Sequence, residues 1–374
     1  MIPYDFLYNA VYDNFLKNID VHCCFLKITN NNSIEYVHKP SINPASESYV
    51  IFYDQEPLDS YIFADKISTL PNFRKSNNRI LISSEQSSDH TLILDKYKMF
   101  GFDYCYHALL SIEWFRQHWY TSTTVNVDFD RTYITYNNLM VGKRLYRTNL
   151  LIELQKKQLL ELGHCSFNTP DTNSIVRSTN AYSYLLPESH KSNIASNLDL
   201  LDKKYVLDSD TIDGNYSAEL DIAHLQTGFV NLVTETIFYE NKVHLTEKIF
   251  KPICAKVPFI LLGGAGNLKY LRNYGFKTFG DYWDESYDDI TSPSQRFDSV
   301  LDVLSKIANT SQSELRSIKQ DMSHILEHNY YHFYKELRPI VVNEFINGLR
   351  STLDQAGIKY EQKDLLHLSR VLNY

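Results

Sequence analysis

The sequence VHLTEKIFKPICAKVPFILLGG, residues 243–264, contains the clearest helix start and buried strand of the chain. Thr246 is a suitable N-cap for a helix, because its hydroxyl can accept a hydrogen bond from a free backbone N–H group. An apolar run over residues 257–262 follows and ends at two glycines. A helix followed at once by a buried strand is typical of alternating α/β folds.

The first turn of this helix contains a lysine in an unfavourable position. Glu247 suits the positive end of the helix dipole, but Lys248 should cost about 0.3–1 kcal/mol there. A bound phosphate would reverse that effect, since helix N-termini attract anions and lysine adds positive charge. The pattern indicates a candidate nucleoside-diphosphate site. An ordinary surface helix with a solvated lysine is the alternative.

Length and composition favour a soluble protein with two domains. The chain has 374 residues, of which 43% are hydrophobic and 22% are charged. Its formal net charge of −8 argues against a protein that holds nucleic acid through its overall field. A local basic groove is compatible with this charge.

Cysteine usage and the N-terminal sequence predict a cytoplasmic protein. The five cysteines are odd in number and form no CxxC pair, which favours buried thiols in a reducing compartment. The first twenty residues are interrupted by charged side chains and lack the apolar core of a signal peptide. No segment approaches 18 apolar residues, so we expect no membrane span.

Strand-like and helix-like patterns alternate in two parts of the chain. The first part has expected strands at 21–28, 49–53, 79–83 and 103–106, and helices at 4–18 and 109–119. The second has expected strands at 133–136, 228–233, 258–262 and 277–279, and helices at 144–162, 267–274 and 294–308, besides the helix after Thr246. This predicts an α/β fold of two Rossmann-like, doubly wound domains facing a cleft. The expected domains are 1–122 and 131–310, followed by a helical segment at 311–374.

Several motifs of the second part occur in a familiar order. They are YNN at 136–138, RTNLLIEL at 147–154, FVNLVTET at 229–236, HLTEK at 244–248 and VPFILLG at 257–263. In these motifs, residues 131–310 resemble the donor-binding half of α1,3-fucosyltransferase-like enzymes, whereas the first domain resembles them only weakly. The resemblance implies an inverting glycosyltransferase with two Rossmann domains, the GT-B type.

The resemblance also implies which residues bind the nucleotide-sugar donor. Lys248 and Arg147 would hold its diphosphate and stabilise that group as it leaves, with Arg144 as the competing arginine. Glu247 would accept hydrogen bonds from ribose or sugar hydroxyls. The other donor-binding candidates are Thr246, Asn138, Gly263, Gly264 and His244, the last of which stands where the family commonly has a tyrosine.

The two glycines that follow the strand could serve the same site. Gly263 and Gly264 begin a glycine-rich turn that can bring backbone N–H groups near a phosphate or sugar. A tight strand-to-helix turn also favours glycine for conformational reasons alone, which is the alternative.

An inverting transfer needs a carboxylate that takes the proton of the acceptor hydroxyl. Glu85, in ILISSEQ at 80–86, and Glu56, in YDQEP at 53–57, both stand at ends of expected strands. Glu85 fits the resemblance better, because the family's catalytic glutamate also follows a strand and precedes a strand like FDY at 102–104. Asp54 and Asp59 are lesser candidates, and each glutamate could instead be a solvated strand-end residue.

These observations predict an enzyme that moves a sugar from a nucleoside-diphosphate sugar to an acceptor hydroxyl, with inversion and without an essential metal. The expected partners are the nucleotide-sugar donor and a glycan or another hydroxyl acceptor. Two alternatives stay open. One is a glycosyltransferase that acts on hydroxylated bases in nucleic acid. The other is a non-catalytic protein that binds sugar nucleotides or glycans.

Overall fold

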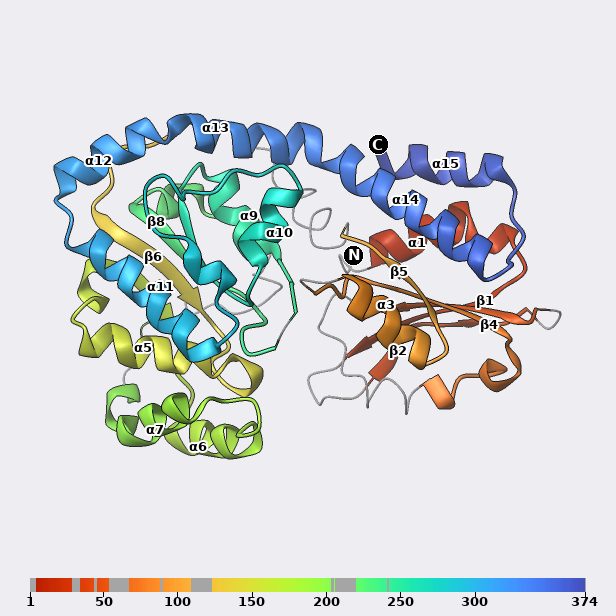
Figure 1. The fold of residues 1–374 in the computed structure, drawn as a ribbon, viewed down its shortest axis with the longest axis horizontal. Helices are drawn as coiled ribbons and strands as arrows, with labels where there is room; N and C mark the ends of the chain where they lie inside the picture. The colour runs from red at the N-terminus through yellow and green to blue at the C-terminus, as the bar shows by residue number, and fades with distance from the viewer. Residues whose placement is uncertain are drawn as a thin grey trace. The chain divides into compact units, whose positions relative to one another are not determined.

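The computed structural model describes residues 5–28, 34–43, 46–53, 67–87, 90–108, 123–202, 205, 220–240 and 242–373 (Figure 1). The chain forms two compact units. Unit 1 comprises Met1–Gln117 and Glu336–Tyr374, and unit 2 comprises His118–Lys335. The expected helical segment at 311–374 is therefore divided between the units. Helices α12 (Gln312–Asp321) and α13 (Ser323–Tyr331) belong to unit 2, and α14 (Leu337–Gln355) and α15 (Gln362–Asn373) belong to unit 1.

Unit 1 is built on a five-stranded sheet with the order β2-β1-β3-β4-β5. The strands are β1 (His22–Ile28), β2 (Ile34–Ser41), β3 (Ser48–Tyr53), β4 (Asn78–Ser83) and β5 (Asp103–Tyr106). Strands β1, β3, β4 and β5 run parallel, as the sequence predicts, and β2 pairs antiparallel with β1 at the edge. The sequence analysis missed β2, whose segment IEYVHKPS contains two charged residues and a proline.

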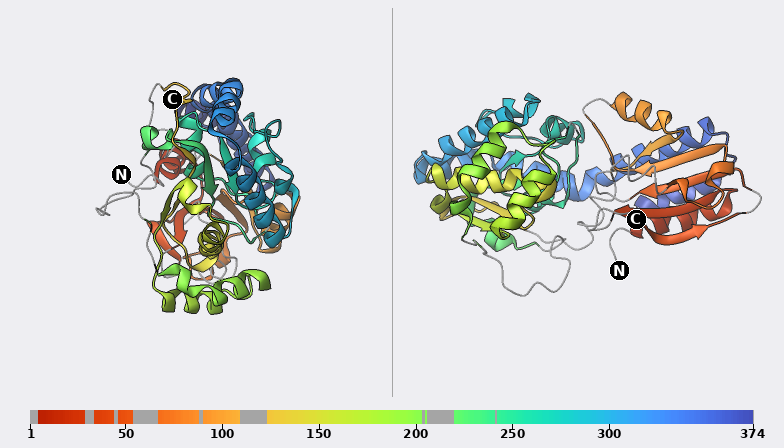
Figure 2. Two further views of the ribbon diagram at one scale, coloured as in Figure 1. Left: turned by 90° about the vertical axis from the view of Figure 1, so that its left-hand side faces the viewer. Right: turned by 90° about the horizontal axis from the view of Figure 1, so that it is seen from below.

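Helices cover both faces of the unit 1 sheet (Figure 2). On one face, the ring of Tyr8 from α1 (Asp5–Asn14) lies 5.2 Å from the rings of Phe25 and Phe52. On the other face, Tyr97 of α3 (His90–Met99) stacks on Tyr104 of β5 at 4.8 Å. The sheet is thus the middle of three layers, as expected for an α/β unit. The helix predicted at 109–119 lies outside the described residues.

Unit 2 contains a four-stranded parallel sheet with the order β7-β6-β8-β9. Its strands are β6 (Arg131–Asn137), β7 (Gly163–Phe167), β8 (Gly228–Thr234) and β9 (Phe259–Leu262). The chain proceeds from β6 to β7 on one side and then to β8 on the other, which makes this sheet doubly wound, as predicted. The topological switch point lies between β6 and β8, where ligands bind in such sheets.

Two sequence predictions in unit 2 are wrong. Strand β7 was missed because its segment GHCSF is short and half polar. Residues 277–279, predicted as a strand, form no ladder, and side chains satisfy their backbone groups instead: Lys277 N donates to Asn329 Oδ1 at 2.8 Å and Phe279 N to Glu285 Oε1 at 2.8 Å.

The helices of unit 2 are mostly those that the sequence predicts, with additional short ones in the polar segment after β7. The α-helices before α12 are α5 (Tyr146–Lys156), α6 (Thr172–Ala181), α7 (Glu188–Ser196), α8 (Ile222–Leu225), α9 (Glu247–Cys254), α10 (Asn267–Asn273) and α11 (Pro293–Ala308). The 3-10 helices include η3 (Gly142–Arg144) and η7 (Ser286–Asp289). Helix α9 begins one residue after Thr246, as predicted, and buries Ile249, Phe250 and Ile253.

A lysine is buried at the amino end of β8. Lys319 of α12 is 0% exposed, donates from Nζ to the Gly228 carbonyl oxygen at 2.9 Å, and lies 4.9 Å from the Phe129 ring centroid. Burial lowers the pKa of Lys319 to about 7. An ammonium group at this position therefore opposes folding at neutral pH, since a charge with one hydrogen bond is poorly compensated for lost water.

The stability of the protein should rise with pH through this lysine. Above about pH 7 folded Lys319 is neutral, whereas the unfolded side chain keeps its proton up to its usual pKa of about 10.4. The unfolded state then binds more protons, so Lys319 adds up to about 1.4 kcal/mol per pH unit to the free energy of unfolding. Urea unfolding at pH 7, 8 and 9 should give a slope of this free energy with pH that is more positive for the wild type than for Lys319→Met by up to about 1.4 kcal/mol per pH unit. The buried cysteines, whose pKa values burial raises, add the same opposing slope to both proteins. Lys306→Met, a change at an exposed lysine, serves as control and should keep the wild-type slope. Equal slopes in all three proteins would contradict the prediction.

Candidate functional site

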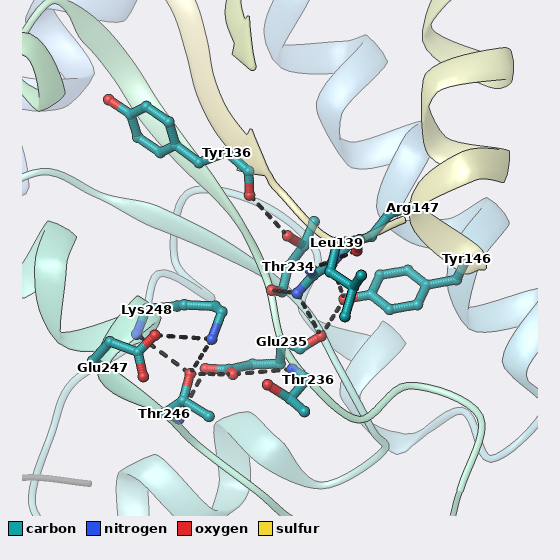
Figure 3. Close-up of polar contacts among 10 residues, drawn as sticks. All are labelled: Tyr136, Leu139, Tyr146, Arg147, Thr234, Glu235, Thr236, Thr246, Glu247 and Lys248. Atoms are coloured by element: carbon teal, nitrogen blue, oxygen red, sulfur yellow. Dashed lines mark hydrogen bonds and ion pairs between the residues drawn. The ribbon is translucent and has the colours of Figure 1, made fainter. Parts of the chain in front are cut away.

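The candidate site lies at the carboxyl edge of the unit 2 sheet, beside the switch point. Two segments meet there: the loop after β6, which leads through η3 into α5, and the loop after β8, which leads into α9 (Figure 3). Thr234 at the end of β8 joins them, because its hydroxyl donates to Asn137 Oδ1 at 2.9 Å. The polar residues labelled in Figure 3 come from both segments.

The guanidinium group of Arg147 binds these two segments together. It donates to the carbonyl oxygens of Leu139 at 3.0 Å, of Thr234 at 2.8 Å and of Glu235 at 3.2 Å. Its Nε donates to the Tyr146 hydroxyl at 3.2 Å, and that hydroxyl donates to the Glu235 carbonyl oxygen. Arg147 is 3% exposed.

These contacts differ from the predicted role of Arg147 as a ligand of the donor diphosphate. Four N–H···O interactions join the guanidinium to other groups of the protein, and a phosphate would have to displace them or use the remaining donor. Arg147 therefore holds the backbone at the switch point in this structure. The competing arginine, Arg144, lies in η3 with part of its surface exposed.

A buried carboxylate continues this network. The Glu235 side chain accepts hydrogen bonds from Thr246 Oγ1 at 2.7 Å, from Thr246 N at 3.2 Å and from Thr236 N at 3.3 Å, and Glu235 is 0% exposed. Burial raises the pKa of Glu235, partly offset by Lys248 and by these hydrogen bonds. The sequence analysis gave Glu235 no role. The feature that could have pointed to Glu235 is its position as an acidic residue directly after a strand, β8, that is buried along its whole length.

Thr246 caps α9, as predicted, and contacts Lys248 twice. The Lys248 backbone N–H and Nζ lie 3.4 Å and 3.1 Å from Thr246 Oγ1. The Lys248 ammonium also pairs with Glu247 Oε1 at 2.9 Å, and this side chain is 31% exposed. Two carboxylates, Glu247 and the buried Glu235, therefore offset the cost of a lysine in the first turn. The sequence analysis assigned that compensation to a bound phosphate alone.

Glu247 is predicted to bind hydroxyls of the donor. In the structure its side chain is 7% exposed and pairs with Lys248. Burial alone would raise the pKa of Glu247, but Lys248, aided by Lys251, more than reverses this, so the group is a carboxylate. An ionised carboxylate keeps free lone pairs for a hydroxyl donor besides the one that faces Lys248.

Further cations surround the loop after β8. Glu240 accepts ion pairs from Lys143 of η3 at 2.8 Å and from Lys242 at 3.2 Å. Burial would raise the pKa of Glu240, but Lys242 and Lys143 more than offset it and hold the pKa below its usual value. These pairs tie the loop to η3 and bring four cationic side chains into the region: Lys143, Arg144, Lys242 and Lys248.

His244 lies among these cations. Its backbone N–H donates to Asn267 Oδ1 at 3.2 Å, and the residue is 7% exposed. Burial lowers the pKa of His244 to about 4, with further lowering by Lys248, Lys242 and Arg144 against the opposite effect of Glu247. The imidazole is therefore neutral near pH 7 in the absence of a ligand.

The glycine turn after β9 serves packing. A Cβ atom on Gly263 would lie 2.6 Å from Asn267 Nδ2, and one on Gly264 would lie 2.5 Å from the Lys242 carbonyl oxygen. The N–H groups at the start of α10 are taken, because Leu268 N and Lys269 N each donate to the Asp288 carboxylate at 2.8 Å. An internal carboxylate thus occupies the start of α10, and close packing is a reason for the two glycines. The contact of Gly263 and Gly264 with a phosphate or sugar stays a prediction.

Two further predicted residues have described positions. Asn138 is exposed on the loop after β6 and accepts a hydrogen bond from Asn168 Nδ2 at 2.9 Å. Glu85, in unit 1, follows β4, and its side chain is 3% exposed. Its carboxylate pairs with Lys96 Nζ at 3.0 Å and accepts from the Tyr97 hydroxyl, both from α3. Glu56, Asp54 and Asp59 lie outside the described residues.

Neither a metal centre nor a membrane span is found in the described parts of the chain. No group of three His, Cys, Asp or Glu side chains there is arranged to hold a metal ion. Across the same residues, no helix has the length and apolar composition needed to cross a membrane.

The comparisons with known proteins give a limited result. No family model matches the sequence, and no curated protein matches it. Among solved structures, a mutant of T4 phage BGT in complex with UDP-glucose has a TM-score of 0.36 and 9% identity, covering 82% of this chain and 74% of that one. A second structure, T4 phage BGT in complex with its UDP-glucose substrate, has a TM-score of 0.34, 10% identity and the same coverage, 82% and 74%. The resemblance to α1,3-fucosyltransferase-like enzymes stays a prediction.

The role of Arg147 in holding the switch point can be tested by stability. Arg147→Ala leaves the buried carbonyl groups of Thr234 and Glu235 without their charged donor. We expect the free energy of unfolding in urea to fall by about 2–4 kcal/mol. Hydrogen bonds to charged groups contribute about 1.5–3 kcal/mol each, and local rearrangement around the shortened side chain recovers part of that loss. Arg177→Ala, on the exposed face of α6, should change it by less than about 0.5 kcal/mol. Unchanged stability of Arg147→Ala, with loss of nucleotide binding, would restore the original prediction of a ligand contact.

Proposed function

We propose that this chain is a glycosyltransferase that moves a sugar from a nucleoside-diphosphate sugar to an acceptor hydroxyl, with inversion and without an essential metal. The observation that carries the proposal is the position of Lys248. Its ammonium lies in the first turn of α9, beside the switch point of a doubly wound sheet, and 31% of its side chain is exposed. Ligand phosphates bind at such positions in other doubly wound folds.

The electrostatics of the region support a diphosphate as the leaving group. The positive charges of Lys248, Lys242 and Arg144 each lower the pKa of His244, so the three cations lie near the same residue. A nucleoside diphosphate gains negative charge as its bond to the sugar breaks, and fixed cations lower the energy of that state. We assign the arginine contact to Arg144 in place of Arg147, and hydroxyl recognition to Glu247.

The transfer needs a proton acceptor. The acceptor oxygen attacks the anomeric carbon, the bond from that carbon to the phosphate oxygen breaks with its electron pair on the phosphate, and a carboxylate takes the hydroxyl proton. Glu85 is the proposed base, with Glu56 as the alternative. To act, Glu85 must exchange its contact with Tyr97 or Lys96 for the acceptor hydroxyl.

Nucleotide binding tests the donor site. Calorimetry with UDP, GDP, ADP and their sugar conjugates should give micromolar binding of one diphosphate, unchanged by EDTA. Lys248→Ala should weaken it about 10- to 100-fold, because a charged hydrogen bond of about 1.5–3 kcal/mol is lost. Lys269→Ala is a matched control, since this exposed lysine lies in the first turn of α10, where Asp288 already occupies the N–H groups.

The outcomes of this titration separate the alternatives. Absence of binding, or equal binding by wild type and Lys248→Ala, would contradict the proposed function. Binding that depends on Lys248, with neither hydrolysis nor transfer of the sugar, would indicate the non-catalytic sugar-nucleotide-binding protein. Transfer to a hydroxylated base but to no glycan would indicate the nucleic-acid-modifying enzyme.

The base is tested with Glu85→Gln. If Glu85 accepts the proton, transfer should fall by about 10²–10⁴-fold while the affinity for the diphosphate stays unchanged. The amide can still accept a hydrogen bond from Tyr97, so the variant should fold. Transfer at the wild-type rate by the folded variant would exclude Glu85 and leave Glu56 as the candidate.

A further inference from the structure

A buried carboxylate lies two hydrogen bonds away from the Lys248 ammonium. Glu235, directly after β8, is 0% exposed, and its Oε2 accepts a hydrogen bond from the Thr246 hydroxyl at 2.7 Å. The Lys248 Nζ lies 3.1 Å from the same hydroxyl oxygen (Figure 3). The three side chains form a hydrogen-bonded relay, Glu235–Thr246–Lys248, and the proposed transfer gives Glu235 no role.

The protons of this relay have one arrangement. Each oxygen of the Glu235 carboxylate faces a backbone N–H group, that of Thr246 at 3.2 Å or that of Thr236 at 3.3 Å, so both oxygens act as acceptors. The Thr246 hydroxyl must therefore give its only proton to Glu235. Its lone pairs are then left for the two donors of Lys248, the backbone N–H at 3.4 Å and Nζ at 3.1 Å.

This arrangement determines the direction of the ammonium group. Lys248 Nζ has three N–H donors, of which one is directed to Thr246 Oγ1 and a second to Glu247 Oε1 at 2.9 Å. Among the described residues, the third donor has no acceptor. Two contacts fix the orientation of a tetrahedral group, so the third N–H has a defined direction, on a side chain that is 31% exposed.

The carboxylate at the other end of the relay is itself held in place. The Glu235 backbone N–H donates to the Leu262 carbonyl oxygen of β9 at 3.0 Å, and its carbonyl oxygen accepts from Arg147 at 3.2 Å. A Cβ atom on Gly263 would lie 3.3 Å from the Cβ of Glu235, so the glycine leaves room for this side chain. The position of the carboxylate thus follows from the sheet.

We propose that Glu235 is a positioning residue for the transfer, which acts through the Thr246 hydroxyl to direct the third N–H of Lys248 to the donor diphosphate. This rests on the proposed function, since it requires a diphosphate at Lys248. A donor that is already oriented loses little freedom when a phosphate binds. It also needs no reorganisation when negative charge develops on the leaving oxygen. Glu235 itself touches neither the donor nor the acceptor.

The test is a double-mutant cycle between Glu235→Gln and Lys248→Ala in the full chain, with UDP and inorganic pyrophosphate as ligands in calorimetry. The glutamine amide places an N–H group where the carboxylate has an acceptor, so the donors that face it can no longer all be satisfied. Glu235→Gln should weaken both ligands about 10-fold. In Lys248→Ala the same change should have an effect of less than about 2-fold, because no ammonium remains to be directed.

Glu285→Gln is the matched control. The Glu285 side chain is 9% exposed and, like Glu235, accepts from a threonine hydroxyl, Thr278 Oγ1 at 2.6 Å, and from a backbone N–H, that of Phe279 at 2.8 Å. Lys248 is not part of that cluster. Both glutamine variants should lower the free energy of unfolding in urea, but Glu285→Gln should leave the affinity for both ligands unchanged.

A second variant interrupts the relay at its middle. Thr246→Val keeps the volume of the side chain and the Glu235 carboxylate but removes the hydroxyl, so it should also weaken both ligands about 10-fold. Thr246→Ser keeps a hydroxyl and should weaken them less than Thr246→Val. This pair tests the relay even if Glu235→Gln does not fold.

The positioning role and the donor site fail in distinguishable ways. Equal weakening by Glu235→Gln in the wild-type and Lys248→Ala backgrounds would show a general structural effect and overturn the positioning role. Lys248-dependent binding of UDP that neither Glu235→Gln nor Thr246→Val weakens would overturn it too, while the donor site stands. If neither UDP nor pyrophosphate binds to the wild type, the donor site and the role of Glu235 are both overturned.

Discussion

The hydrogen bonds from Arg147 to the backbone of two loops are the constraint on which the candidate site depends. In a doubly wound sheet the strands at the switch point send their chains in opposite directions. The carbonyl groups of Leu139, in the loop after β6, and of Thr234 and Glu235, at the end of β8, therefore need donors from another element. Arg147 supplies those donors. Because Glu235 is held by its carbonyl group, its carboxylate is directed to Thr246, and Thr246 in turn fixes the start of α9 and the position of Lys248.

The periodicity of the sequence was sufficient for the parts of the fold that depend on burial. The four parallel strands of unit 1, the strands β6, β8 and β9 of unit 2, and α9 with its cap at Thr246 follow from residue types alone. The missed and mistaken strands have another origin. Edge strand β2 and strand β7 contain polar residues, since an edge strand or a half-exposed one does not need a continuous apolar run. Residues 277–279 resemble a strand, but Asn329 and Glu285 satisfy their backbone.

The places of the candidate site residues in the fold were predictable from the sequence, but their contacts were not. Residue types located Lys248, Glu247 and His244 near the end of β8, because the carboxyl ends of parallel strands share one edge. They could not show that Arg147 binds carbonyl groups, because an arginine on an amphipathic helix has the same sequence pattern whether its guanidinium faces solvent or the switch point. They also could not show that Asp288, 20 residues after Leu268, accepts the backbone hydrogen bonds at the start of α10. Both facts depend on pairs distant in sequence.

In the proposed transfer, the charge balance of the region would allow a site with internal ion pairs to favour the reaction. Lys248 already has Glu247 as a partner, so a bound donor gains less from this ammonium than it would from an unpaired one. The departing diphosphate carries more charge than the bound donor, and it therefore competes with Glu247 more strongly in the transition state. An interaction of this kind contributes little to ground-state binding and more to the rate, which is the distribution that catalysis requires. In the proposed reaction, the carboxylate beside Lys248 would thus let the cation respond to the charge that develops as the bond breaks.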